Sequence, residues 1–269
     1  MTRIIGIASA KGGVGKTTVA SNLGIALYTE FNIDTILVDA NFTASHLGLH
    51  LGMYYFPTTF NTVLAGKAKM EESIYRHISG VRFVPASLNL EDLVEVDTRK
   101  IKRAIKRLKG KTDIVFIDCA AGLGKEALLM MKVCDELLIV ANPELPSIMD
   151  AKKVSQVAEG IGCKVLGIVL NRVRHSPYEL TPREIEEQTQ LPILAIIPED
   201  SLVQKSILYK MPAVMLDPDA ALSIEFKKLA ARIVGKEYKP KILRKSLIDD
   251  VSRSLKRIFI GGLTTFRRI

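Results

Sequence analysis

A glycine-rich loop near the start of the chain carries the residue types best suited to binding phosphate. The apolar run Ile4–Ala8 precedes it, an amphipathic stretch from Thr17 to Tyr28 follows it, and its residues are Gly12, Gly13, Val14, Gly15, Lys16, Thr17 and Thr18. Because glycine has no Cβ, backbone N–H groups can surround an anion there, and the helix dipole adds to the attraction. Lys16 would reach the β- and γ-phosphates of a nucleotide, and the Thr17 hydroxyl would bind Mg²⁺. Strand, loop and helix in this order predict a phosphate-binding loop rather than an ordinary glycine turn.

Polar side chains also stand at the ends of two later apolar runs. Asp39 and Asn41 follow one run, and Asp118 ends another. In a doubly wound sheet, ligands gather at the carboxyl ends of the strands, so Asp39 and Asn41 can face the bound phosphates. The competing explanations are local ones. Asn41 would then be a turn-forming residue, and Asp118 would be the N-cap of a following helix.

The elements that position these residues alternate along the chain. Seven short apolar runs predict parallel strands buried on both faces: Ile4–Ala8, Thr35–Val38, Val81–Pro85, Ile114–Ile117, Leu137–Val140, Val165–Leu170 and Ile193–Ile197. Helical periodicity lies between them at Leu90–Leu108, Lys125–Val133, Ser147–Glu159, Pro182–Gln188 and Ala220–Val234. With 269 residues, of which 48% are hydrophobic, the chain can bury one large core. We predict an α/β fold with a doubly wound, mostly parallel sheet between two helix layers.

The loop departs from the general phosphate-binding pattern, because Ala10 replaces a glycine and Lys11 follows it. The run Lys11–Thr18 resembles the deviant loop of the MinD/ParA family of P-loop ATPases, and Thr43–Gly52 is similar to archaeal MinD-like members. The resemblance implies a SIMIBI-type P-loop fold with ATP or ADP and Mg²⁺ as cofactors. It also implies a homodimer with ATP sandwiched between the subunits, in which Lys11 touches the phosphates bound by the partner.

The same resemblance assigns roles to the strand-end residues. Asp39 matches an acid close to the metal and its water, and Asp118 matches the acid that holds Mg²⁺ through a water molecule. Gly122 could turn its N–H toward the γ-phosphate. Asn41 stands where the family has a second aspartate, which positions the attacking water. An amide can orient water but cannot accept its proton, so we expect slow ATP hydrolysis.

Two later stretches resemble the family's adenine-binding loops. Asn171 and Arg172 end one strand, and Pro198 and Glu199 end the next. An amide can match both a donor and an acceptor on the adenine edge, and the chain has no guanine-reading motif. In the family, the helix after a loop similar to Ala141–Ala151 lies at the dimer interface. The resemblance therefore favours adenine as the base and places this helix between subunits.

The last residues form a basic tail. Residues 236–269 hold ten lysines and arginines against three acids, while the whole chain has a formal charge of +9. An apolar stripe at helical spacing runs through the tail, formed by Leu243, Leu247, Ile248, Val251, Leu255, Ile258 and Phe259. A basic helix with such a stripe is typical of binding to an anionic membrane surface. Packing of the tail on the body and binding of nucleic acid remain alternatives. We therefore expect an ATPase domain over residues 1–235 and a membrane-binding tail over residues 236–269.

Cysteine use and hydropathy indicate the compartment. Cys119, Cys134 and Cys163 show no paired spacing, which is typical of reduced, buried thiols. The four histidines form no metal-ligand pattern, and we interpret them as ordinary surface or core residues. No signal peptide precedes Arg3, and no apolar run reaches the roughly 18 residues of a membrane span. We expect a cytoplasmic protein that associates peripherally with the membrane in its ATP state.

These observations predict a MinD-like ATPase that positions a division site or polar machinery, with an unidentified protein activator or cargo. A ParA-like partition ATPase that binds DNA through the tail is one alternative. An ATP-binding regulator with little turnover is another, and Asn41 favours it. An iron–sulfur carrier would need cluster-ligand cysteines, and the three cysteines are not suitably spaced.

Overall fold

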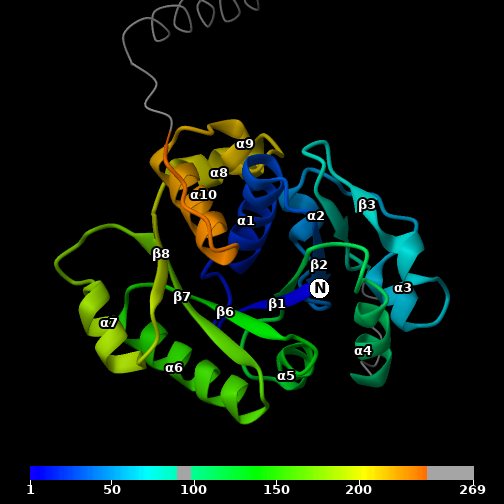
Figure 1. The fold of residues 1–269 in the computed structure, drawn as a ribbon, viewed down its shortest axis with the longest axis horizontal. Coiled ribbons are helices and arrows are strands. Elements are labelled where there is room, and N and C mark those ends of the chain that lie inside the picture. The colour runs from blue at the N-terminus through cyan, green and yellow to red at the C-terminus, as the bar shows by residue number, and fades with distance from the viewer. Residues whose placement is uncertain (90–97, 241–269) are drawn as a thin grey trace, which may run out of the picture. The chain divides into compact units, whose positions relative to one another are not determined.

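The computed structural model describes residues 1–89 and 98–240 (Figure 1). Residues 1–238 form one compact unit, and residues 239–269 belong to a second. The apolar stripe of the tail, including Leu247, Val251, Leu255, Ile258 and Phe259, therefore lies outside the described residues. Among the described helices, none is long and apolar enough to cross a membrane.

An eight-stranded sheet in order β3-β4-β2-β5-β1-β6-β7-β8 forms the centre of residues 1–238. The strands are β1 Arg3–Ala8, β2 Thr35–Ala40, β3 Tyr75–Arg76, β4 Arg82–Val84, β5 Ile114–Cys119, β6 Glu136–Ala141, β7 Lys164–Val173 and β8 Ile193–Pro198. Every pairing is parallel except that of β3 with β4. The four strands β1, β2, β5 and β6 are buried on both faces almost throughout, which explains their continuous apolar sequences. The predicted doubly wound sheet is confirmed.

Helices cover both faces of this sheet (Figure 1). One apolar core lies under α3 Phe60–Leu64, α4 Thr98–Lys106, α5 Lys125–Met131, α6 Leu145–Gly160 and α7 Pro182–Thr189. The other lies under α1 Lys16–Phe31, α2 Leu47–His50, α8 Ser201–Leu208, α9 Ala213–Leu216 and α10 Ala221–Ile233. A short 3-10 helix, η1, spans Met70–Ser73.

All seven predicted strands are present, and the differences lie in the short elements. Strand β3 has two residues and α2 and α9 have four residues each, too few for hydrophobic periodicity to indicate them. Helices α3 and α8 were also not predicted. Helix α6 begins at Leu145, ahead of the predicted Ser147, because Pro146 is well suited to the first helical turn. The first part of the predicted helix Leu90–Leu108 lies outside the described residues.

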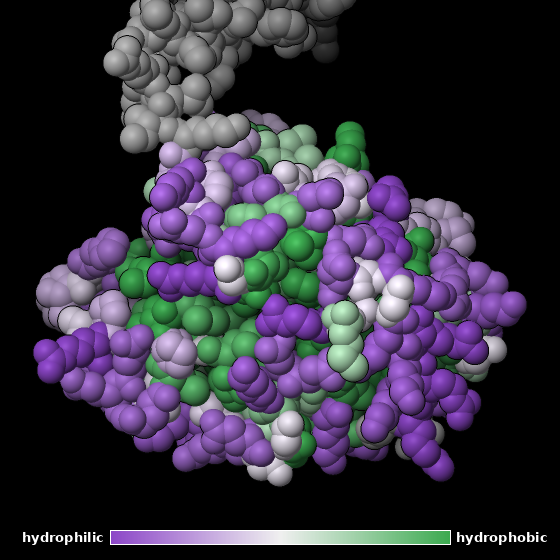
Figure 2. Space-filling model, viewed as in Figure 1, coloured by the Kyte–Doolittle hydropathy of each residue, from purple (hydrophilic) through white to green (hydrophobic). Residues whose placement is uncertain are grey.

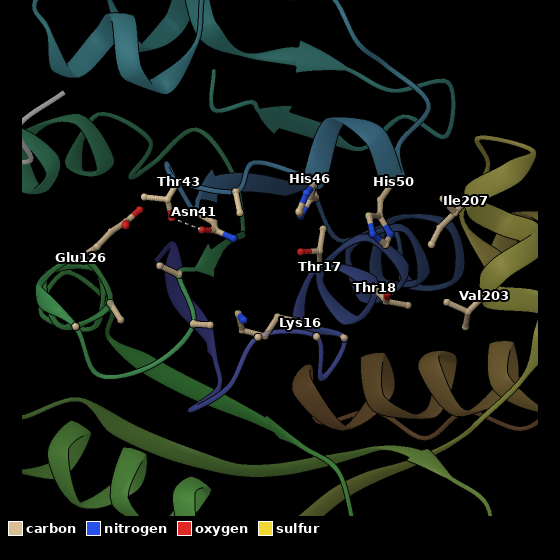
Figure 3. A pocket seen from close by; sticks show the side chains of 18 of the residues that line it. Lys16, Thr17, Thr18, Asn41, Thr43, His46, His50, Glu126, Val203 and Ile207 are labelled. Carbon is tan, nitrogen blue, oxygen red and sulfur yellow. Dashed lines mark hydrogen bonds between the residues drawn. The ribbon is translucent and has the colours of Figure 1, made fainter. Parts of the chain in front are cut away.

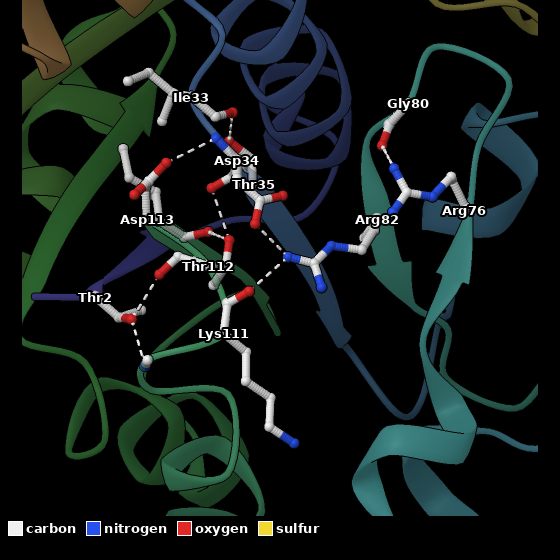
Figure 4. A network of polar contacts seen from close by, with 12 residues as sticks. Thr2, Ile33, Asp34, Thr35, Arg76, Gly80, Arg82, Lys111, Thr112 and Asp113 are labelled. Carbon is white, nitrogen blue, oxygen red and sulfur yellow. Dashed lines mark hydrogen bonds and ion pairs between the residues drawn. The ribbon is translucent and has the colours of Figure 1, made fainter.

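A polar network ties together the amino ends of the central strands (Figure 4). Arg82 donates to the Asp34 carboxylate and, from Nη2, to the Lys111 carbonyl at 2.8 Å. Thr2 Oγ1 donates to the Thr112 carbonyl at 2.6 Å and accepts from the Gly110 N–H at 2.8 Å. These bonds connect β1, β2, β4 and the turn before β5. The chain's own polar groups therefore bond to one another at this edge of the sheet.

The three cysteines agree with the sequence-based expectation. Cys119, Cys134 and Cys163 are all free and buried. A hydrogen bond with the Cys119 thiol, together with burial, raises the pKa of Cys134, and burial raises the pKa of Cys163 to about 12. Thiols held in this state are poor nucleophiles.

Candidate functional site

The carboxyl ends of β1, β2 and β5 border a cleft of about 640 Å³ (Figure 3). The predicted phosphate-binding residues form one wall of it: Gly12, Gly13, Gly15, Lys16, Thr17 and Thr18. Asn41 lies on the other wall, with Ala120 and Ala121 from the end of β5. The structure thus brings the loop and two strand ends together, as ligand binding at the carboxyl edge of a parallel sheet requires.

Backbone conformation explains why the loop needs glycine. Gly13 has φ +78° and Gly15 has φ +101°, both in the left-handed region that favours glycine. Gly15 is also the N-cap of α1, so the helix begins at the loop. A Cβ on Gly15 would lie 2.1 Å from Nδ2 of Asn171, an impossible contact. The loop conformation and the position of Asn171 therefore depend on each other.

Lys16 extends into the cleft from the first turn of α1. The residue is 7% exposed, and its Nζ donates to Ser9 Oγ at 3.0 Å. Burial lowers the pKa of Lys16, although the Asp118 carboxylate opposes the shift. A buried ammonium with one neutral hydrogen-bond partner is stabilised by an anion placed beside it. Phosphate oxygens meet this requirement.

Asp39 and Asp118 lie directly opposite each other on β2 and β5. Burial raises the pKa of Asp39 to about 6. Burial, together with the Asp39 carboxylate, raises the pKa of Asp118 to about 7. Burial is the main cause of both shifts, and the nearby Asp39 carboxylate adds to the shift of Asp118. A divalent cation near the pair would favour their ionised forms.

Thr17 and Asp118 are the residues that would bind Mg²⁺. Thr17 Oγ1 donates to Asp118 Oδ2 at 2.7 Å, while Asp118 Oδ1 is buried without a hydrogen-bond partner. Such an oxygen suits a water molecule in a Mg²⁺ shell. In the described part of the chain, no cluster of three His, Cys, Asp or Glu side chains could hold a metal by itself. The site therefore fits Mg²⁺ that is held mainly by nucleotide phosphates.

Asp39 is arranged differently from Asp118. Its Oδ1 accepts from the Asn41 N–H at 3.1 Å, and its Oδ2 accepts from Ser45 Oγ at 2.8 Å and the Leu47 N–H at 3.1 Å. Both oxygens are thus used to fix the segment after β2. In this conformation Asp39 orders the wall that carries Asn41.

The N–H of Gly122 is bonded within the chain. The residue has φ +89°, and its N–H donates to the Ser9 carbonyl at 2.8 Å. Turning this N–H toward a γ-phosphate would require that bond to break.

A second cavity of about 320 Å³ adjoins the loop at Gly15 and Thr18. Its walls include all four residues predicted to surround the base: Asn171, Arg172, Pro198 and Glu199. Asn171 Nδ2 donates to the Val14 carbonyl at 2.7 Å, which leaves its Oδ1 available to accept. Glu199 forms an ion pair with Arg174. The structure therefore brings two distant strand ends to the side of the phosphate loop.

Comparison with known proteins agrees with this geometry. Residues 5–213 match the model of the CobQ/CobB/MinD/ParA nucleotide binding domain. The chain belongs to this family. An uncharacterised ATP-binding protein of Methanocaldococcus jannaschii is 35% identical over 259 residues, covering 96% of this chain and 97% of the relative. A putative septum site-determining protein MinD of Guillardia theta is 30% identical, covering 98% of this chain and 100% of the relative.

A solved structure extends the similarity to the fold. The septum site-determining protein MinD of Pyrococcus horikoshii OT3, complexed with Mg-ADP, has a TM-score of 0.83 and 39% identity over 87% of this chain and 96% of that chain. This chain is therefore a MinD-like ATPase of the MinD/ParA family, as the loop sequence predicted.

Lys11, the distinguishing lysine of the MinD/ParA loop, lies apart from the cleft. It is not among the residues that line the cleft, and its Nζ lies 3.3 Å from Asp150 Oδ2. Its side chain is 54% exposed. The first turns of α6 also expose Leu145 and Met149, which are 51% and 41% exposed. The predicted interface helix thus exposes apolar side chains and pairs with a lysine that does not line its own cleft.

Sequence reasoning missed Glu126. This residue lies in the first turn of α5, lines the cleft, and accepts from the Phe42 N–H at 2.7 Å through Oε1. Figure 3 shows it beside Thr43 and Asn41, and the Thr43 hydroxyl donates to Asn41 Oδ1 at 3.4 Å. Burial raises the pKa of Glu126. An acid shortly after Asp118 in the sequence was the available signal.

Two histidines were also missed as cleft residues. His46 and His50 line the cleft at the start and end of α2. Burial, with the neighbouring His46, lowers the pKa of His50 to about 4. The two histidines are four residues apart and follow the end of β2, and this spacing could have indicated that they lie near the cleft. A neutral His50 adds no charge to compete with Lys16 for phosphate.

Proposed function

We propose that this MinD-like ATPase is an ATP-dependent switch for membrane association. Two copies dimerise around ATP and Mg²⁺, and the paired tails then bind an anionic membrane surface. Slow hydrolysis to ADP releases both contacts. The observation that carries the proposal is Lys11, which is exposed, does not line its own cleft, and pairs with Asp150 on the helix that also exposes Leu145 and Met149.

The cleft supports phosphoryl transfer to water. Bound ATP and Mg²⁺ supply the transferable γ-phosphoryl group and the charge that stabilises its transfer. Lys16 and the loop N–H groups would hold the phosphates, and Thr17 and Asp118 would hold the metal. Asp39 orders the segment that carries Asn41. Asn41 would orient the attacking water, and Lys11 of a second copy would reach the phosphates. Asn171, Arg172, Pro198 and Glu199 would surround adenine.

Replacing Asn41 by aspartate tests the slow-turnover part of the proposal. We expect Asn41→Asp to raise ATP turnover by about 10-fold, because a carboxylate can accept the proton of the water that an amide only orients. Steady-state phosphate release at saturating ATP measures the change. Asn41→Ala is the matched control and should lower turnover. A native chain with no ATP-dependent phosphate release beside an active Asn41→Asp variant would instead indicate an ATP-binding regulator.

The membrane part is tested by sedimentation with anionic vesicles. We expect the full chain to sediment with ATP and to remain in solution with ADP, because dimerisation makes insertion of the second tail intramolecular. Leu255→Glu together with Ile258→Glu should abolish sedimentation by placing charge in the apolar stripe. Ser246→Glu with Ser252→Glu adds the same charge outside the stripe, and this variant should keep most of the sedimentation. Sedimentation that does not respond to nucleotide would contradict the switch.

A further inference from the structure

Helix α4 and the turn after it carry a dense basic surface. Residues 99–111 hold eight cations and no acid: Arg99, Lys100, Lys102, Arg103, Lys106, Arg107, Lys109 and Lys111. The other residues of the 1–235 region hold 20 lysines and arginines against 26 acids, four of which stand in residues 90–97, outside the described part. The positive charge of this region is therefore concentrated on one element of an otherwise acidic body, which indicates an anionic partner.

The cations occupy one side of α4. Ile101, Ala104, Ile105 and Leu108 are buried in the core below the sheet, while the eight basic residues are all exposed. At 100° per residue, the cations cover about half of the helix circumference and the apolar residues cover the other side. The helix is thus anchored by its apolar face and presents a rigid array of charge to solvent.

Three of these eight cations lie near acids within the described ranges. Lys111 and Arg107 lie 2.7 Å and 3.8 Å from Glu71, and Lys109 lies 3.5 Å from Asp135. The remaining group of Lys100, Lys102, Arg103 and Lys106 forms no ion pair with any residue in the described ranges. Exposed pairs such as those of Glu71 are weak and yield to a polyanion.

The location of α4 separates it from the root of the tail. Helix α4 belongs to the core layer with α3, α5 and α6, on one face of the sheet (Figure 1). The last residue of the compact unit, Tyr238, lies on the other face, where its ring contacts Phe31 of α1 at 6.4 Å between centroids. The α4 cations therefore do not surround the point where the tail begins. A partner of their own explains them better than shared contact with the membrane surface that the tail would bind.

We propose that α4 is a docking surface for the phosphate backbone of duplex DNA, read without regard to base sequence. Within α4, Lys102 and Lys106 are spaced by four residues, as are Arg99 and Arg103, so each pair forms a row with a rise of about 6 Å. Arginine binds phosphate through two parallel hydrogen bonds, and lysine binds it as a point charge. Such contacts supply non-specific DNA affinity through the release of counterions.

The composition of α4 favours a duplex over the other polyanions. Residues 98–112 contain no aromatic side chain, whereas binding of single strands relies on stacking of bases on aromatic rings. Its apolar side chains are buried in the core, so α4 offers nothing to insert into a lipid layer. Figure 2 shows hydrophilic side chains covering the side of the molecule on which α4 lies in Figure 1.

Charge reversal on α4 of the full chain tests the proposal. The variant Lys102→Glu/Arg103→Glu/Lys106→Glu keeps strong helix formers at all three positions. We expect its affinity for a short fluorescent duplex to fall by at least about 30-fold near 0.1 M salt, and the slope of log affinity against log salt to shrink by about 2 to 3. Fluorescence anisotropy across a salt series measures both. Circular dichroism and thermal melting check that the variant is folded.

A matched control separates the α4 surface from the overall charge. Lys164→Glu/Arg183→Glu/Lys228→Glu makes the same change in net charge at exposed sites on β7, α7 and α10, and should weaken duplex binding by about threefold at most. Lys102→Arg/Lys106→Arg should keep the native affinity. Equal losses in both charge-reversal variants, or no loss in the α4 variant, would overturn the proposal.

Two further arms distinguish the partner. Tighter binding to a single strand of the same length, with the same dependence on α4, would overturn the duplex assignment. Loss of sedimentation with anionic vesicles in the α4 variant, while duplex binding is unchanged, would make α4 a membrane surface instead. ATP turnover and the nucleotide dependence of vesicle binding are separate readouts, so failure here does not decide the proposed switch.

Discussion

Replacing Lys16 by glutamine is expected to abolish ATP turnover, with a fall in kcat/KM of at least about 10³-fold. Lys16 is the buried cation of the cleft, and its Nζ has Ser9 Oγ as its hydrogen-bond partner at 3.0 Å. In a low-dielectric cleft, a preorganised charge stabilises the developing charge of phosphoryl transfer far more than it would in water. Glutamine has a similar length but no charge. Phosphate release under saturating and limiting ATP gives kcat and KM separately.

The same variant should lose no thermal stability when nucleotide is absent. Burial lowers the pKa of Lys16 in the folded chain, so the ammonium reduces folding stability at neutral pH. This cost falls as pH rises through the folded pKa and is gone above the unfolded pKa. Lys16→Gln removes the charge, and its melting temperature without nucleotide should equal or exceed that of the native chain.

Added nucleotide should raise the melting temperature of the native chain more than that of Lys16→Gln. Mg²⁺ and ATP at 100 times the dissociation constant stabilise a folded protein by about 2.7 kcal/mol, which raises the melting temperature of a domain of this size by roughly 5–10 °C. The native chain should show this rise, and Lys16→Gln should lose most of it. Lys67→Gln, at an exposed lysine beyond α3, is the control and should match the native chain in turnover and melting. An active Lys16→Gln variant would refute the assignment of the cleft.

The parts of the fold that repeat a simple period were predictable from sequence. The seven parallel strands are apolar runs because helices cover both of their faces, and Gly15 needs glycine for its φ of +101°. These constraints act on neighbouring residues, so they produce a pattern that can be recognised in the sequence. The cleft residues Lys16, Thr17 and Asn41 followed from them, since strand ends at one edge must meet.

Contacts between segments that are far apart in the sequence produce no such pattern. Asn171 donates to Val14, a partner 157 positions away, and Glu126 accepts from Phe42, 84 positions away. The first places Asn171 and the second cavity beside the phosphate loop, and the second places an acid beside Asn41. No repeating pattern in the sequence around Asn171 or Glu126 indicates which residue it contacts. Only the arrangement of β1, β2, β5 and β7 in the folded sheet brings them together.

Replacing Lys11 by glutamine should separate ATP binding from ATP turnover. Lys11 does not line its own cleft, so the affinity for ATP should change by about threefold at most, because the groups that hold the phosphates within one copy remain. Turnover should fall by about 10²- to 10³-fold, since a second copy can no longer deliver a cation to the phosphates. Equilibrium binding of a fluorescent ATP analogue and phosphate release measure the two effects. Light scattering with ATP should detect dimers of the native chain and monomers of the variant.

The contact between Lys11 and Asp150 supplies the control. Their 3.3 Å ion pair is largely exposed, and Lys153 and then Lys11 hold the pKa of Asp150 below its usual value. Asp150→Asn removes the charge that holds Lys11 within its own subunit but leaves Lys11 free to reach a partner. This variant should therefore keep turnover close to the native rate, in contrast to Lys11→Gln. If Lys11→Gln hydrolyses ATP at the native rate across a range of protein concentrations, one copy is sufficient for the chemistry and the sandwich dimer is wrong.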